Sequence, residues 1–181
     1  MEFEFNPVIA AVRNDCEIEK ALESDVDIVF HLVPSLFTLC DIVKKIHEKN
    51  KKIFIHIDLA EGIGKDRSGI IFAKNAGVDG IISTKLGMIK EAKEAGLVTV
   101  QRFFIIDSHS VDTTIEALKK SKPDMIEIMP GVVTKIVKNL KSKISVPIIA
   151  GGLIEEKSEI YDVLNCGASA ISTGKNELWN G

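Results

Sequence analysis

Cysteine, tryptophan and tyrosine are scarce in this sequence of 181 residues, with 3, 1 and 1 copies. The cysteines, Cys16, Cys40 and Cys166, form no CxxC pair and are odd in number, which argues against a disulfide framework and a zinc centre of paired cysteines. We expect reduced thiols at core or boundary positions. The histidines and carboxylates also lack the spacing of a zinc site, so we expect no metal.

Long apolar runs are missing as well. The longest, such as VPIIAGGLI at Val146–Ile154, are much shorter than the roughly 20 residues that cross a bilayer. Glu2 and Glu4 do not fit the basic start of a signal peptide. We therefore expect a cytoplasmic protein that does not enter a membrane.

Arginine is rare among the cations, because all basic residues except Arg13, Arg67 and Arg102 are lysines. Where lysine is the common surface cation, an arginine is a candidate for a site that needs a planar, two-pronged donor. The formal net charge is -3. The chain as a whole thus has no electrostatic reason to bind nucleic acid, although a local basic face can exist on an acidic protein.

Lysines gather in two stretches of the sequence, 44–52 and 135–143. A solvated helix face explains most clusters of this kind, and contacts to a nucleic-acid backbone are the alternative. No aromatic residue lies within either stretch. Neither therefore offers a stacking surface for single-stranded bases.

Short apolar runs recur along the chain at the spacing of strands. They are Val8–Val12, Ile28–Val33, Ile53–Asp58, Gly80–Thr84, Val98–Ile106, Met125–Met129, Val146–Ala150 and Ala170–Thr173. Helical periodicity is found between them, at Glu17–Leu22, Leu36–Lys49, Arg67–Ala76, Leu86–Ala95, Ser110–Lys120, Val132–Leu140 and Glu156–Asn165. The strands lack polar alternation, so helices cover both faces and the sheet is parallel.

Eight such strands form either a closed barrel or an open, doubly wound sheet. The first turn lacks the GxGxxG dinucleotide motif, and polar residues follow nearly every strand, as in a barrel that builds its site from many loops. We predict a compact α/β protein, a TIM-like (β/α)8 barrel that forms a single domain over residues 1–181.

The segment after the last strand is short. Only Lys175–Gly181 remain, so the eighth helix should be reduced or missing. The barrel wall left uncovered there favours a homo-oligomer, because exposed apolar faces usually mark interfaces. A truncation at the C-terminus is the alternative.

The loops after the seventh and eighth strands have the composition of a phosphate site. In barrels of this kind a phosphate commonly lies between these loops and a short extra helix. Glycines allow close backbone approach, hydroxyls donate hydrogen bonds, and a helix start attracts anions. The alternative is that the glycines only form tight turns. The candidates are Gly151, Gly152, Ser172, Thr173, Gly174 and Lys175.

The stretch 53–66, IFIHIDLAEGIGKD, combines a buried strand with a charged, glycine-rich loop. In a strand, His56 and Asp58 would point to the same side. The loop that follows has the freedom and the charges to close over a small anion. A salt-bridged turn with Asp66 as N-cap of the next helix is the alternative. The loop adds Glu61 and Lys65 to the candidates.

Further candidates are polar groups that end or interrupt apolar strands. Glu127 interrupts the strand MIEIM, where a carboxylate must be paired, hydrogen-bonded or protonated. Lys85 suits a phosphate contact or the surface better than a Schiff base. The remaining candidates are Arg13, His31 and Arg102.

The motifs HIDLAEGIGKD, VQRFFIIDS, IEIMPG, IIAGGLI and ISTG, in this order between Pro7 and Trp179, resemble the glycerol-3-phosphate responsive antiterminator family. This resemblance implies a barrel that senses glycerol 3-phosphate and binds leader mRNA of glycerol operons, without catalysis and without a cofactor. We expect the glycerol group to meet Asp58 and Glu127, and Arg13, Lys85 or Arg102 to balance the charge. Ordering of loop 61–67 by the ligand would then raise RNA affinity.

The rival hypothesis is an enzyme acting on a small phosphorylated substrate, such as an isomerase, an aldolase or a thiamine phosphate synthase-like transferase. Asp58, Glu127 and Lys85 could supply the acid, the base and the electrophile. The loops, however, contain no convincing acid–base pair at a fixed spacing.

Overall fold

The computed structural model describes residues 6–180, and Glu2 and Glu4 lie outside this range. The eight parallel strands form one closed barrel in chain order, as predicted, with each strand paired to its neighbours and β1 paired to β8. The strands are β1 Val8–Val12, β2 Ile28–His31, β3 Lys52–His56, β4 Gly80–Ser83, β5 Val98–Phe104, β6 Met125–Met129, β7 Ile148–Gly151 and β8 Ala170–Thr173.

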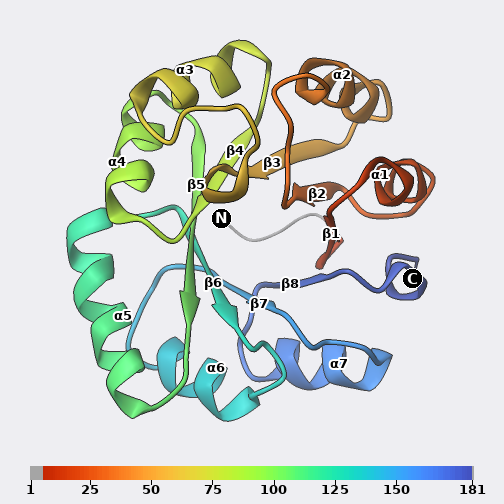
Figure 1. The fold of residues 1–181 in the computed structure, drawn as a ribbon. Coiled ribbons are helices and arrows are strands. Elements are labelled where there is room, and N and C mark those ends of the chain that lie inside the picture. The colour runs from red at the N-terminus through yellow and green to blue at the C-terminus, as the bar shows by residue number, and fades with distance from the viewer. Residues whose placement is uncertain (1–5, 181) are drawn as a thin grey trace.

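Within residues 6–180, seven α-helices surround the strands (Figure 1). They are α1 Asp15–Leu22, α2 Leu39–Glu48, α3 Arg67–Asn75, α4 Leu86–Glu94, α5 Ser108–Ser121, α6 Thr134–Lys141 and α7 Lys157–Asn165. Side-chain caps fix several starts: Asn14, Asp66 and Asp107 accept from the backbone N–H three residues ahead, which satisfies a donor that the helix leaves free.

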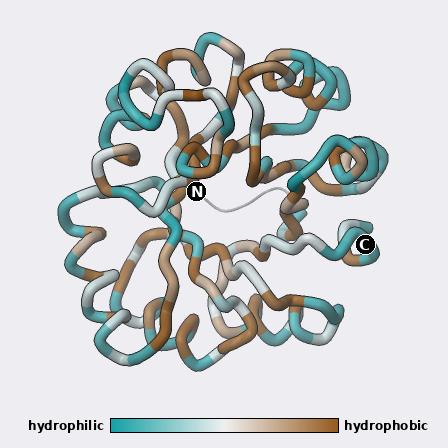
Figure 2. Tube along the Cα trace, in the orientation of Figure 1, coloured by the Kyte–Doolittle hydropathy of each residue, from teal (hydrophilic) through white to brown (hydrophobic). Residues whose placement is uncertain are grey.

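Three apolar clusters form the core. The barrel interior holds inward-facing residues such as Phe30, Phe54 and Ile149. A first outer cluster lies between the early strands and α1–α4, and a second lies between the late strands and α5–α7. In Figure 2 the strands are largely hydrophobic, and the outer sides of the helices are hydrophilic. This arrangement leaves the ends of the strands as the place for polar chemistry.

The eighth helix is reduced to a single 3-10 turn, η2 Asn176–Leu178, as the short segment after the last strand predicts. This turn lies between α7 and α1 (Figure 1). Trp179 follows it, is 1% exposed, and donates its indole N–H to the Thr173 carbonyl at 2.9 Å. One buried indole thus fills part of the space that a helix would occupy.

Two predictions about local placement were wrong. The third strand ends at His56, and Asp58 lies in a 3-10 turn, η1 Ile57–Leu59, so it does not share a strand face with His56. Cys16 and Cys40 are exposed on α1 and α2, so they do not fill the core. None of the helices within residues 6–180 is long and apolar enough to span a bilayer.

Candidate functional site

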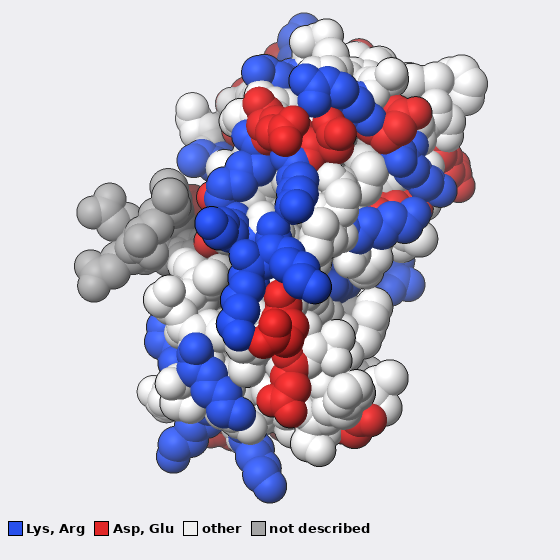
Figure 3. All heavy atoms as spheres, turned by 90° about the vertical axis from the view of Figure 1, so that its left-hand side faces the viewer, with Lys and Arg blue, Asp and Glu red and all other residues white. Residues whose placement is uncertain are grey.

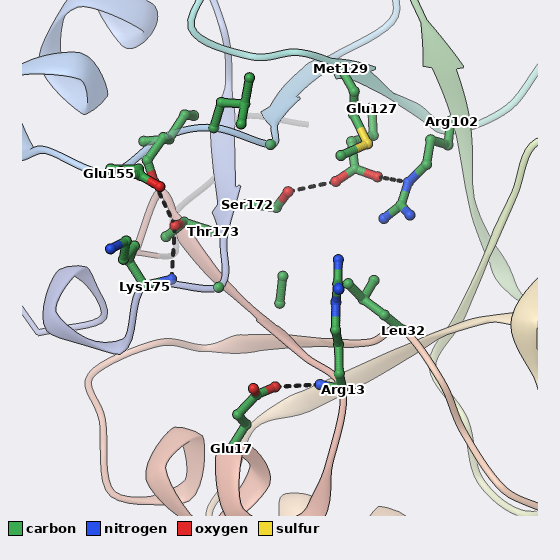
Figure 4. A pocket seen from close by; sticks show the side chains of 15 residues that line it. Arg13, Glu17, Leu32, Arg102, Glu127, Met129, Glu155, Ser172, Thr173 and Lys175 are labelled. Carbon is green, nitrogen blue, oxygen red and sulfur yellow. Dashed lines mark hydrogen bonds and ion pairs between the residues drawn. The ribbon is translucent and has the colours of Figure 1, made fainter.

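A cavity of about 350 Å³ opens at the C-terminal ends of the strands. Its walls come from β1, β2 and β5–β8 with their loops (Figure 4). Eight of the residues singled out in the sequence line it, namely Arg13, Arg102, Glu127, Gly152, Ser172, Thr173, Gly174 and Lys175. Its size and its mixture of polar and apolar walls suit a small metabolite.

A hydrogen-bonded network forms the floor of this cavity. Arg102 Nε donates to Glu127 Oε2 at 2.6 Å, and Ser172 Oγ donates to Glu127 Oε1 at 2.5 Å. Arg102 is 7% exposed and Glu127 1%. Burial of an unpaired carboxylate is costly, and here both oxygens of Glu127 accept a hydrogen bond. The Glu127 interruption of an apolar strand is thus explained by a paired, hydrogen-bonded carboxylate.

Gly151 makes room for this network, although it is not itself part of the cavity wall. A Cβ at this position would lie 2.5 Å from Glu127 Oε1 and 2.6 Å from Ser172 Oγ, well inside van der Waals contact. Only glycine fits where the Glu127–Ser172 hydrogen bond passes β7. Gly152 is different, because its φ of +77° is one that glycine adopts freely.

The loop after β8 is held in place by its own polar groups. Thr173 Oγ1 donates to the Ile154 carbonyl at 2.8 Å and accepts from the Lys175 N–H at 3.1 Å. The Thr173 hydroxyl therefore joins the β7 and β8 loops and is already engaged. In this loop, Gly174 and the Lys175 ammonium remain as the groups that can face an anion.

Two arginines approach the cavity from opposite walls. Figure 4 shows the side chains of Arg13 and Arg102 extending toward the same space. Glu17 accepts the Arg13 backbone N–H at 2.6 Å, which leaves the Arg13 guanidinium to the cavity. Planar guanidinium groups suit the oxygens of a phosphate or carboxylate. Of the three arginines, Arg13 and Arg102 line the cavity and Arg67 does not, and anion binding by the first two stays a prediction.

His31 does not line the cavity. Its neighbours Phe30 and Leu32 belong to the barrel interior cluster, so alternation turns His31 outward, toward α1. Burial lowers its pKa, and the Val12 carbonyl opposes this effect. His31 is therefore a buried neutral histidine between the strands and the helices.

Asp58 also lies outside the cavity, because the turn η1 directs it toward the end of β4. Its carboxylate accepts from the Ser83 hydroxyl at 2.7 Å and from the Thr84 N–H and hydroxyl at 2.7 and 2.9 Å. Burial opposes ionisation of Asp58, but these hydrogen bonds outweigh it and lower the pKa. Asp58 fixes the loop between β4 and α4.

Glu61, Lys65 and Lys85 are likewise not part of the cavity wall. The Glu61 N–H and carbonyl bond to Pro34 and Leu36. Lys85 is the N-cap residue of α4, and its N–H donates to Ser83 Oγ. Loop 61–67 has the form of the alternative considered from the sequence, a capped and salt-bridged turn: Asp66 caps α3, and Arg67 pairs with Glu91 and Glu94 at 2.9 and 3.3 Å.

Sequence reasoning missed several residues at the site. Leu32, Met129 and Leu153 supply its apolar surface, and Glu17 and Glu155 add carboxylates.

His56 points into the barrel interior, and neither ring nitrogen has a hydrogen-bond partner within residues 6–180. The pKa of His56 is lowered to about 4, mainly by burial and in addition by the positive charge of Arg102. Strand alternation from Phe54 could have indicated the inward direction of His56.

Residues 6–180 contain no group of three or more His, Cys, Asp or Glu side chains that could hold a metal ion. The expectation that the protein uses no metal stays a prediction.

Comparisons with known proteins agree on one family. The family described as glycerol-3-phosphate responsive antiterminator matches residues 8–179. The glycerol uptake operon antiterminator regulatory protein of Listeria monocytogenes is 34% identical, with a TM-score of 0.93 over 99% of this chain and 97% of that chain. An antiterminator-related protein of Thermotoga maritima is 33% identical, with a TM-score of 0.86 over 97% and 98%.

Other similar proteins add less about function. The Escherichia coli K12 protein YgcP, described as uncharacterized, is 38% identical over 175 residues, which cover 96% of this chain and 92% of YgcP. The orotidine 5'-phosphate decarboxylase of Pyrococcus horikoshii is 16% identical, with a TM-score of 0.71 over 92% of this chain and 88% of that chain. At that level of identity the likeness concerns the fold alone.

Proposed function

This chain belongs to the family of glycerol-3-phosphate responsive antiterminators, and from that premise we propose that it senses glycerol 3-phosphate and binds the leader mRNA of glycerol-utilisation operons. Bound protein would prevent early termination of transcription. The observation that carries this proposal is the cavity at the strand ends, where two arginines and two glycine loops surround a space of about 350 Å³.

We assign the phosphate to the side of the cavity formed by the β7 and β8 loops. A phosphate group carries about 1.5 to 2 negative charges at neutral pH, and Arg13 and Lys175 are the cations near these loops. Gly152 and Gly174 present backbone without a Cβ on the same side. The glycerol hydroxyls would then reach Glu127 and Ser172 on the floor of the cavity.

The proposed role does not include turnover. Of the groups that the enzyme hypothesis needs, only Glu127 lines the cavity, and both of its oxygens already accept hydrogen bonds. Asp58 is bound to Thr84, and Lys85 lies at the N-cap of α4. An acid, a base and an electrophile around one reacting atom are therefore not brought together by these three residues.

Sensing requires that the ligand change the affinity for RNA. A ligand shifts an equilibrium only by its different affinities for two states, and such coupling is typically about five- to 150-fold. From the sequence, loop 61–67 is the element expected to couple ligand binding to RNA binding, but hydrogen bonds hold its residues away from the cavity. We propose instead that it begins at the loops that line the cavity, 152–155 and 174–175.

The test is a titration of leader RNA with the purified protein, at one fixed salt concentration, with and without saturating glycerol 3-phosphate. We expect tighter RNA binding with the ligand, the reciprocal gain of ligand affinity with RNA, and recovery of the ligand intact. An RNA of scrambled sequence is the control. Identical curves would end the regulatory proposal, and a consumed ligand would favour the phosphate-binding enzyme.

A homo-oligomer and a cytoplasmic location stay predictions. Support for the oligomer comes from the apolar groove beside η2, which is lined by Pro7, Ile160, Leu164 and Leu178 and flanked by Tyr161, 66% exposed. Light scattering on the protein and on a Tyr161→Glu variant tests it. A monomeric wild-type protein at all concentrations would contradict it.

A further inference from the structure

The side of the barrel formed by α3, α4 and α5 carries a dense group of lysines. Figure 3 faces this side and shows lysine and arginine side chains gathered in a band across it. All of the lysines concerned are exposed. They define the lysine band, which consists of Lys74 on α3, Lys90 and Lys93 on α4, Lys119 and Lys120 on α5, and Lys122 at the C-cap of α5.

Neighbouring carboxylates neutralise only part of this charge. Lys93 pairs with Asp124 at 3.1 Å and Lys119 with Glu116 at 2.6 Å. Lys74, Lys90, Lys120 and Lys122 form no ion pair with a carboxylate among residues 6–180. Six lysines against two paired carboxylates leave four positive charges in the band. Glu91 and Glu94 of α4, at its edge, pair with Arg67.

The lysine cluster near α2 is different, although it is more conspicuous in the sequence. There three exposed ammonium groups each meet a carboxylate: Lys44 meets Glu48, Lys45 meets Glu19, and Lys49 meets Glu23, at 4.0, 2.6 and 2.8 Å. These pairs cancel most of the local charge. An acidic protein thus keeps an unneutralised cationic face on α3–α5 while α2 is locally balanced.

Two lysines of the band are held in place by the helix next to them. Lys74 Nζ donates to the Ala95 carbonyl at the end of α4, and Lys93 Nζ donates to the Lys122 carbonyl at the end of α5, both at 2.6 Å. The helix dipole favours lysines in last turns. It does not account for Lys90, which lies inside α4. The held lysines fix the spacing of the charges across three adjacent helices.

We propose that the lysine band binds the phosphate backbone of the leader RNA at a base-paired stem. The inference rests on the proposed function and names the surface that would carry it. Lysines are point-charge donors for phosphates. The exposed large hydrophobic residue on α3–α5 is Ile71, so these three helices present no exposed aromatic ring for stacking single-stranded bases. A stem is read through its backbone without such rings.

The band and the cavity occupy different parts of the molecule. In a parallel barrel, the last turns of the helices lie at the end opposite to the mouth, and Lys74, Lys93 and Lys119 belong to such turns. The cavity is at the mouth. RNA and glycerol 3-phosphate can therefore bind the same molecule together, as coupling between them requires.

The test removes three of the four unpaired charges in a triple variant, Lys90→Gln with Lys120→Gln and Lys122→Gln. A matched control, Lys44→Gln with Lys45→Gln and Lys49→Gln, makes the same change in net charge at the balanced cluster. A second control makes the same change, lysine to glutamine, at Lys135, Lys138 and Lys143 near α6. Leader RNA affinity is measured at several salt concentrations, and glycerol 3-phosphate affinity is measured by calorimetry.

We expect the band variant to lose at least about tenfold in RNA affinity, with the slope of log K against log salt reduced by about 2 to 3. Its affinity for glycerol 3-phosphate should be unchanged. If wild-type protein binds RNA and the band variant matches it, or if a control variant loses as much, the surface assignment is overturned. Wild-type protein that binds no leader RNA would overturn the proposed function itself, and this inference with it.

Discussion

Arg102 on β5 and Glu127 on β6 stand opposite each other in the register of the two strands. Their side chains meet at 2.6 Å in a place where neither is more than 7% exposed. A buried ion pair adds little to stability compared with a well-packed apolar pair, but removing one partner leaves the other as an uncompensated buried charge. The pair thus makes the floor of the cavity sensitive to single substitutions.

Replacing Arg102 with methionine should lower the free energy of unfolding by about 3 to 5 kcal/mol, because Glu127 loses its partner. Urea unfolding measures this loss. Arg67→Met is the control, since its ion pairs are exposed to solvent and their loss should cost far less stability. Adding Glu127→Leu to Arg102→Met should restore much of the stability. A double variant as unstable as the single one would contradict this account.

Gly151→Ala should disrupt the network without changing any charge. The added methyl group would take the space of the Glu127–Ser172 hydrogen bond, so we expect a loss of about 1 to 3 kcal/mol in the affinity for glycerol 3-phosphate. Calorimetry measures it. Gly87→Ala, on α4 with nothing within 4 Å of the new Cβ, should bind normally and be slightly more stable. Equal affinities in the two variants would exclude this role for Gly151.

Substitutions of Asp58 and of Ser172 should have different effects, the first on stability and the second on ligand binding. Asp58→Ala removes the acceptor of three hydrogen bonds and should cost about 2 kcal/mol of stability while leaving ligand affinity unchanged. Ser172→Ala should weaken ligand binding by about 1 to 3 kcal/mol, because Glu127 loses one of its two hydrogen-bond donors. Thermal unfolding and calorimetry on both variants check this. If Asp58→Ala protein is folded but binds the ligand more weakly, Asp58 does contribute to ligand binding.

His56 should make stability depend on pH. Its pKa is about 4 in the folded protein, against an ordinary value of 6.5, so the unfolded chain takes up the proton first as the pH falls. Stability from this group is complete above about pH 6.5 and is lost toward pH 4, by about 3 kcal/mol in total.

Urea unfolding from pH 7 to pH 4 tests this. His56→Leu should flatten the curve, whereas His109→Gln, at an exposed position, should not. The lowered pKa of buried His31 leaves a smaller slope of the same sign. A wild-type curve and a His56→Leu curve with equal slopes would contradict the prediction.

The order and type of the elements follow from the sequence, because buried parallel strands and amphipathic helices have different periodicities. The bounds of β1, β6 and β8 are those predicted. The loops after β7 and β8 and two of the three arginines, which line the cavity, could also be identified, since glycine pairs and rare arginines are visible locally. The reduced eighth helix followed from counting the residues after β8.

Other features depend on relations across the chain. The Arg102–Glu127 pair requires the register between β5 and β6, which apolar patterns do not specify. Asp58 was misplaced because the apolar run continues through Ile57 although the strand ends at His56. The lysine band collects single residues from separate helices, so no run of sequence shows it.

The neighbouring residues Leu178 and Trp179 pack into different outer clusters, Leu178 into the second and Trp179 into the first. Val8 on β1 packs against both. Together with Val8, these two adjacent residues therefore join the two outer clusters beside the β1–β8 pairing. Replacing both Leu178 and Trp179 with alanine should therefore open the barrel to protease along the β1–β8 seam.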